Sequence, residues 1–97
     1  MAMSVAYHAE EGRLDITIAE NLDLSQTREI LKAQGFIDDQ LQTCVIDCTR
    51  VGQVFDSGKA LILMLLEKLA RFHVRLVMIG EFAGVSCQHP LLARASS

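Results

Sequence analysis

The segment between residues 43 and 80 constrains the fold most, because a helical pattern there is enclosed by two strand patterns. TCVIDC, residues 43–48, is a short apolar run with β-branched residues, which is typical of a buried strand. VRLVMIG, residues 74–80, predicts a second strand. Between them a helix is predicted to end near Arg71, and its core stripe is Leu61, Ile62, Leu65, Leu66 and Leu69. Neighbouring strands joined by a helical crossover lie parallel in one sheet, so this segment predicts an α/β fold.

Two more strands are predicted near the start of the chain. SVAYHA, residues 4–9, and RLDITIA, residues 13–19, flank the turn EEG at residues 10–12. The second segment alternates polar residues with the apolar residues Leu14, Ile16 and Ile18. This alternation is the pattern of a strand with one buried face.

Residues 22–35 predict the first helix. Asp23 and Gln26 have the spacing of a capping box, and Gly35 is a natural C-terminal stop. Leu24, Leu31 and Thr27 are predicted to form the inward stripe. The element order is therefore β-β-α-β-α-β, and we expect residues 1–97 to form a single domain.

Composition narrows the class of partner. Hydrophobic residues make up 51% of the chain, which favours a packed core over disorder. The net charge is −3, which gives no electrostatic reason to bind nucleic acid or an anionic membrane. The apolar run from Ala60 to Leu66 is far shorter than the roughly 20 residues of a membrane span. We therefore expect a cytoplasmic protein without membrane insertion.

The cysteines do not predict a metal site. Cys44 and Cys48 would share a strand face with Ile46, which predicts buried small hydrophobes. Cys87 and His89 are too few and too isolated for zinc. No metal and no cofactor are predicted.

No catalytic residue is predicted either, so we expect a binding protein and not an enzyme. Ser57 lacks the Gly-x-Ser-x-Gly elbow, because Phe55 and Lys59 occupy the glycine positions. A nucleotide-binding P-loop is excluded, because five residues separate Gly52 from Gly58 and Ala60 follows the lysine.

Asp56-Ser57-Gly58 stands directly before the second helix and predicts its N-terminus. Ser57 is the expected N-cap, and Asp56 could cap a helix that begins one residue earlier. A phosphate on Ser57 would be held by the helix N-terminus, with Lys59 and Arg50 as nearby cations. Ser57 as a simple cap and Ser57 as a modified residue both stay open at this point.

The run from Cys44 to Gly80 resembles the centre of a STAS domain, the fold of bacterial anti-sigma factor antagonists. In that family a strand ends near an Asp, and Asp-Ser-Ser/Thr-Gly opens an apolar helix. Gly58 falls on the family's glycine, Ser57 on the second hydroxyl position and Asp56 on the first, which is the position that a partner kinase phosphorylates.

A second patch of the chain agrees with the family pattern. Leu22 and Asp23 match the family's Glu-Leu-Asp segment, although Asn21 replaces the Glu. Phe55 replaces the Asp that begins the second motif. The resemblance implies a mixed β-sheet covered by helices, with a shortened C-terminal helical region after Gly80.

The resemblance implies a regulatory binding protein that docks on a serine kinase or anti-sigma factor, with a phosphatase restoring the binding form. Ser57 is the predicted phosphorylation site. The predicted partner-binding residues are Asp23, Asp56, Ser57, Gly58, Lys59, Leu61 and Ile62. The alternative is a structural subunit of a lipid-transport or stress-sensing complex, in which Asp56 is a permanent charge. A homodimer stays open.

Overall fold

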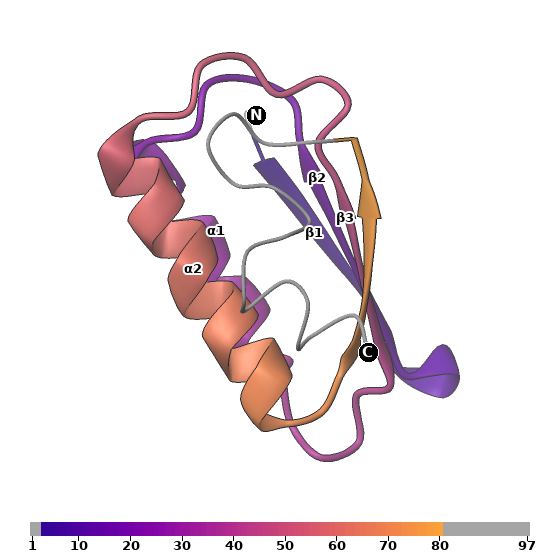
Figure 1. The fold of residues 1–97 in the computed structure, drawn as a ribbon. Coiled ribbons are helices and arrows are strands. Elements are labelled where there is room, and N and C mark those ends of the chain that lie inside the picture. Colours follow the sequence, from indigo (N-terminus) through magenta and orange to yellow (C-terminus); the bar gives the residue numbers. More distant parts are fainter. Residues whose placement is uncertain (1–2, 81–97) are drawn as a thin grey trace.

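Strands and helices follow one another in the predicted order in the computed structural model, which describes residues 3–80 (Figure 1). The strands are β1 (Met3–His8), β2 (Arg13–Ile18), β3 (Thr43–Asp47) and β4 (Arg75–Ile79). The helices are α1 (Thr27–Gly35) and α2 (Asp56–Arg71), and two 3-10 turns are η1 (Ala9–Glu11) and η2 (Leu24–Gln26). The β-β-α-β-α-β prediction is confirmed.

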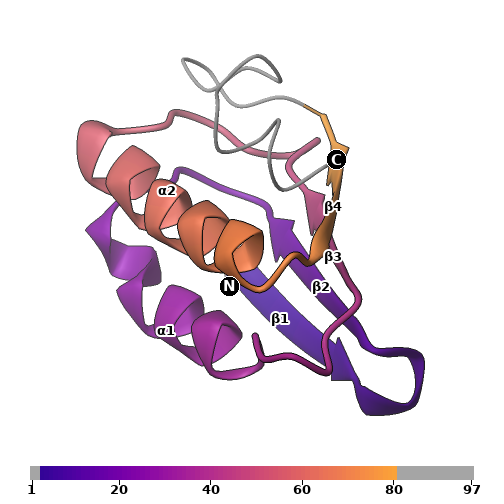
Figure 2. The ribbon, with the colours of Figure 1, turned by 60° about the horizontal axis from the view of Figure 1, so that its bottom comes forward.

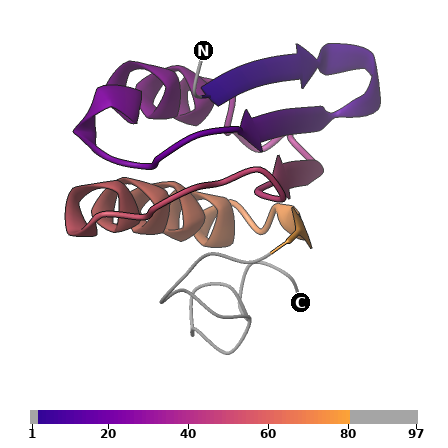
Figure 3. The same ribbon diagram turned by 90° about the horizontal axis from the view of Figure 1, so that it is seen from above.

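The four strands form one mixed sheet in the order β1-β2-β3-β4. β1 is antiparallel to β2, and η1 with Gly12 at φ 59° closes this hairpin. β2, β3 and β4 are parallel. Both crossovers step across the sheet in the same direction, so the right-handed rule places α1 and α2 on one face (Figures 1 and 3).

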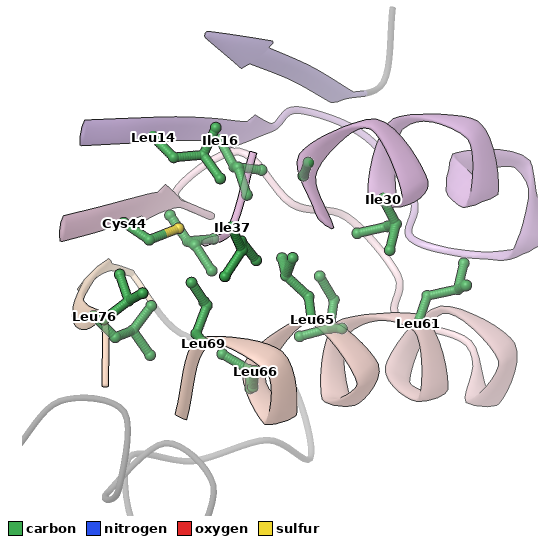
Figure 4. Packing of buried hydrophobic residues seen from close by; sticks show 14 of the residues in the cluster. Leu14, Ile16, Ile30, Ile37, Cys44, Leu61, Leu65, Leu66, Leu69 and Leu76 are labelled. Carbon is green, nitrogen blue, oxygen red and sulfur yellow. The ribbon is translucent and has the colours of Figure 1, made fainter. Parts of the chain in front are cut away.

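The core lies between the sheet and the two helices. All five residues of the predicted α2 stripe are buried, and Figure 4 shows Leu61, Leu65 and Leu69 on the side of α2 that faces the sheet and Ile30 of α1. On β2 the buried residues are Leu14, Ile16 and Ile18, as the alternation predicts. Burial of these aliphatic side chains is the main term that stabilises the fold.

The prediction for the inward face of α1 is wrong. Leu24 is 65% exposed and Leu31 is 55% exposed. The buried residues of this segment recur instead at Leu22, Gln26, Ile30, Ala33 and Ile37. These positions have helical spacing, but polar Gln26 in the stripe hides the pattern in the sequence.

The cysteines of the third strand behave as predicted. Cys44 and Cys48 are buried on the same face as Ile46, and the Cys48 thiol donates to the carbonyl of Ile79 at 3.1 Å. Burial raises the pKa of Cys44 to about 12, and the negative charge of Asp15 adds to the effect. The thiol of Cys44 is therefore protonated at neutral pH.

Some predictions fall outside residues 3–80. Cys87, His89 and the shortened C-terminal helical region lie outside the described residues, so they stay predictions. Within residues 3–80, neither α1 nor α2 is both long and apolar enough to cross a membrane.

Candidate functional site

Two loops lie paired where β2 and β3 end. The Leu22 N–H donates to the carbonyl of Gln53 at 2.9 Å, and the Phe55 N–H donates to the carbonyl of Leu22 at 3.0 Å. Leu22 and Val54 thereby form a parallel bridge. Because Asp23 follows Leu22 and Asp56 follows Phe55, the pairing brings these two carboxylates to one edge of the molecule.

Asn21 holds the same two loops together through its side chain. Its Oδ1 accepts a hydrogen bond from the Gln53 N–H at 2.8 Å. Gly52 lies so close that a Cβ there would meet this oxygen at 2.5 Å. Asn21 is a positioning residue that was not predicted from the sequence. The one hint in the sequence was that Asn stands where the family has Glu.

Asp23 forms the predicted capping box with Gln26. Oδ1 of Asp23 accepts from the Ser25 N–H at 2.8 Å, and Oε1 of Gln26 accepts from the Asp23 N–H at 2.6 Å. The box begins η2, which leads into α1. The Ser25 hydroxyl and then the Ser25 N–H lower the pKa of Asp23 below its ordinary value of 3.8.

A second carboxylate at the end of β3 is held in the same way. The Asp47 carboxylate accepts from the Thr49 N–H at 3.0 Å and from the Thr49 hydroxyl at 2.7 Å. These two hydrogen bonds, with a smaller attraction from Arg50, lower the pKa of Asp47. Both Asp23 and Asp47 are therefore carboxylates at neutral pH.

We expect the free energy of unfolding to fall as the pH drops below 3.8 through the lower pKa values of folded Asp23 and Asp47. A depressed folded pKa contributes stability above the unfolded pKa, and that contribution disappears on protonation. Urea midpoints measured between pH 7 and acid will test this. The double variant with Asp23→Asn and Asp47→Asn keeps a neutral hydrogen-bond acceptor at both positions, so its free energy of unfolding should depend less on pH in this range. An unchanged pH dependence would show that these two carboxylates do not cause the loss.

The prediction that Ser57 or Asp56 caps α2 is wrong. The helix begins at Asp56, so Phe55 is the N-cap residue, with φ −87° and ψ 161° and no side-chain cap. The Phe55 carbonyl accepts from the Lys59 N–H at 2.9 Å, while its own N–H is bound to Leu22. The loop pairing thus fixes the start of α2, and Ser57 is the second helical residue.

Gly58 lies where the first turn of α2 meets the other loop. A Cβ at this position would stand 2.8 Å from the Asp23 nitrogen and closer still to the Leu22 carbonyl. Real Cβ atoms do not approach backbone so closely. This contact gives a physical reason for glycine at the family's glycine position.

The predicted partner-binding residues divide into exposed and buried ones. Asp56 is exposed, and Asp23, Ser57 and Lys59 are half-buried. Leu61 and Ile62 are only 7% and 1% exposed, and Gly58 is buried. Because these three pack inward, direct contact with a partner is not expected from them. The partner-binding role of all seven residues stays a prediction.

Two exposed apolar side chains flank the carboxylates. Phe55 is 39% exposed beside Asp56, and Leu24 is exposed beside Asp23. We call Asp23, Leu24, Phe55, Asp56 and Ser57 the docking edge. Sequence reasoning missed the apolar pair because it assigned Leu24 to the core.

A polar hollow of about 420 Å³ lies next to the docking edge. Its lining residues are Ala19, Glu20, Asn21, Asp23, Ser25, Gln26, Arg50 and Gly52. Arg50 is the only cation among them. Among residues 3–80, no group of three His, Cys, Asp or Glu side chains is placed to hold a metal ion.

Solved structures share this architecture. The unphosphorylated anti-sigma factor antagonist SpoIIAA matches with a TM-score of 0.69 and 19% identity, over 86% of this chain and 76% of SpoIIAA. The antisigma-factor antagonist STAS domain from Rhodobacter sphaeroides matches with a TM-score of 0.56 and 15% identity, over 80% of this chain and 84% of that one. The chain has a STAS-like fold.

These matches confirm the predicted fold class. The STAS-like fold also occurs inside a larger protein. Mglu matches with a TM-score of 0.64 and 19% identity, over 80% of this chain but only 19% of Mglu. No protein-family model matches the sequence, and no curated protein matches it. The likeness is therefore one of fold.

Proposed function

We propose that this STAS-like protein is a cytoplasmic regulatory binding module whose docking edge binds a serine kinase of the anti-sigma type. The observation that carries the proposal is the loop pairing. It places two carboxylates and two exposed apolar side chains beside Ser57 in a fold shared with anti-sigma factor antagonists. Apolar contacts flanked by charges are the usual composition of a protein-binding surface.

Ser57 is the residue that we propose to be phosphorylated. It is half-buried in the first turn of α2, where unpaired N–H groups and the helix dipole attract a phosphate. The phosphate would add up to about two negative charges next to Asp56. A partner surface that fits the unmodified edge would then meet repulsion and a desolvation cost. A phosphatase would restore the binding form.

Mass spectrometry of the protein recovered from its host will test the modification. We expect intact and phosphopeptide spectra to show one phosphate on Ser57, and none in the Ser57→Ala variant. Because Ser57 is not a cap, Ser57→Ala should change the free energy of unfolding by less than about 0.5 kcal/mol. An unmodified Ser57 in every growth condition would contradict the switch.

Binding by charge variants tests the docking edge itself. A photo-crosslinking residue in place of exposed Phe55 should capture a serine kinase, and the same residue in place of Leu31 on α1 should not. Ser57→Asp should weaken binding to that kinase roughly a hundredfold, about 2.8 kcal/mol, whereas neutral Ser57→Asn should retain most of it. Equal affinities of the two variants would contradict the charge switch.

One feature favours the structural-subunit alternative. Asp56, and not a hydroxyl residue, stands at the family's modified position, and it is exposed. A permanent carboxylate there fits a subunit that stays bound in one state. Under this alternative Ser57 is never phosphorylated, and the crosslinked protein is a component of a stable assembly instead of a kinase.

A further inference from the structure

The sheet has a second face that no helix of residues 3–80 covers (Figures 1 and 2). The side chains on it alternate with the buried ones, so the register places them in three rows across the strands. The row at one end contains His8, Arg13, Thr43 and Arg75. The middle row contains Ala6, Asp15, Val45 and Val77, and the row at the other end contains Ser4, Thr17, Asp47 and Ile79.

Charge changes sign along this open face. One end carries two arginines and His8, and the other end carries Asp47. Arg13 is already bound by Asp15 at 3.1 Å and by Glu11 at 3.2 Å, and His8 is bound by Asp15 at 3.1 Å. Within the described part of the chain Asp47 and Arg75 form no ion pair, so each is available to an outside partner.

An apolar strip separates the two ends. Val45 and Val77 lie side by side and half-buried, and Ile79 is 44% exposed. Beside them is a hollow of about 360 Å³, lined by Arg13, Asp15, Ile16, Thr17, Val45, Asp47 and Ile79. The face therefore has an acidic end, an apolar middle and a basic end. When a second copy is turned end for end and laid on this face, the acidic end of each copy meets the basic end of the other.

We infer that the open face binds a second copy of this chain, face to face, with the strands of the two copies antiparallel. The two-fold axis then lies between the sheets and across the strands, through the middle row. Val45 and Val77 meet the same residues of the second copy. Asp47 meets the second copy's basic end, opposite its Thr43 and next to its Arg75, which has no ion pair among the described residues. The contact is isologous and closed, as in most homodimers.

The other two-fold arrangement is disfavoured by charge. An axis along the strands would keep them parallel and would place each row against itself. Arg75 would then face His8 of the second copy and Asp47 would face its Thr17, so the two charges without ion pairs would not meet. Only the antiparallel arrangement puts opposite charges together at both ends.

The area of the face sets the strength of the contact. Four strands about 4.8 Å apart and about 17 Å long give a face of roughly 320 Å². A standard interface covers roughly 800 Å² per partner, so the dimer is weak and reversible. Charges therefore decide its stability, and added salt should weaken it.

Sedimentation equilibrium of the full chain over a range of concentrations tests the dimer. We expect a shift from the 10.7 kDa monomer to twice that mass as concentration rises. Val45→Asp should weaken association at least tenfold, while Leu31→Asp on the exposed side of α1 should not change it. Circular dichroism verifies that both variants are folded. A wild type that is monomeric throughout overturns the inference and leaves residues 81–97 or another protein as occupants of the face.

A charge-reversal pair tests the antiparallel arrangement. Asp47→Arg alone places positive charges together, and Arg75→Asp alone places negative charges together, so each should weaken the dimer about tenfold. The double variant restores opposite charges across the interface and should recover to within about threefold of the wild type. A double variant as weak as the single variants would overturn the antiparallel pairing. The docking edge is not altered, so these outcomes are independent of the proposed function.

Discussion

Gly58→Ala should destabilise the protein by about 3 kcal/mol or more, although alanine is the better helix former. The added methyl group would stand 2.8 Å from the Asp23 nitrogen and against the Leu22 carbonyl. These are backbone atoms held by the loop pairing, so they cannot rotate away as a flexible side chain can. Either α2 or the loop must move, which breaks hydrogen bonds of the docking edge. Urea denaturation of wild type and variant will measure the loss.

Gly35→Ala is the matched control for Gly58→Ala. Gly35 is also helical, at the end of α1, and a Cβ there would meet nothing within 4 Å. Its φ is not positive, so alanine fits without strain. The substitution should stabilise the protein by about 0.4–1 kcal/mol, because alanine lowers the conformational entropy of the unfolded chain. If Gly58→Ala left the free energy of unfolding unchanged or raised it, as Gly35→Ala should, the loop would have to yield without cost, contrary to our expectation.

Leu65→Ala should cost about 3 kcal/mol, because Leu65 is fully buried at the centre of the α2 stripe. It points between α1 and the sheet, as Figure 4 shows. Truncation removes contacts with both layers and leaves a cavity that rigid neighbouring strands cannot fill. The change in urea midpoint at constant m-value is the measurement.

Met64→Ala tests whether burial causes this loss. Met64 directly precedes Leu65 in the same helix and is 43% exposed. The substitution keeps helix propensity and removes side-chain atoms from the solvent side, so it should cost less than about 1 kcal/mol. If both variants lost the same free energy, local helix propensity would explain the result instead of core packing.

The fold could be predicted from sequence wherever the hydrophobic pattern was uninterrupted. The α2 stripe from Leu61 to Leu69 and the alternation of β2 specified both element type and buried face. α1 was predicted with the wrong face because its stripe includes Gln26, which is buried through a bond to the Asp23 backbone. A polar residue that is buried by a local hydrogen bond cannot be recognised from hydropathy.

The site was predicted only in part for a related reason. The capping box depends on a spacing of three residues and is visible in the sequence. The start of α2 depends on contacts between Leu22 and Phe55, more than thirty residues apart, so local rules placed it at the wrong residue. The same long-range contact explains Gly58, which the sequence analysis understood only through family resemblance.

The paired loops also make the arrangement of the two carboxylates depend on the folding of a long segment. The bond between Leu22 and Phe55 closes a segment that contains all of α1 and β3. Before that segment is ordered, closure is opposed by chain entropy and Asp23 and Asp56 have no fixed relation. A protein that has to contact both carboxylates at once would therefore bind the folded chain and not one in which this segment is still unordered.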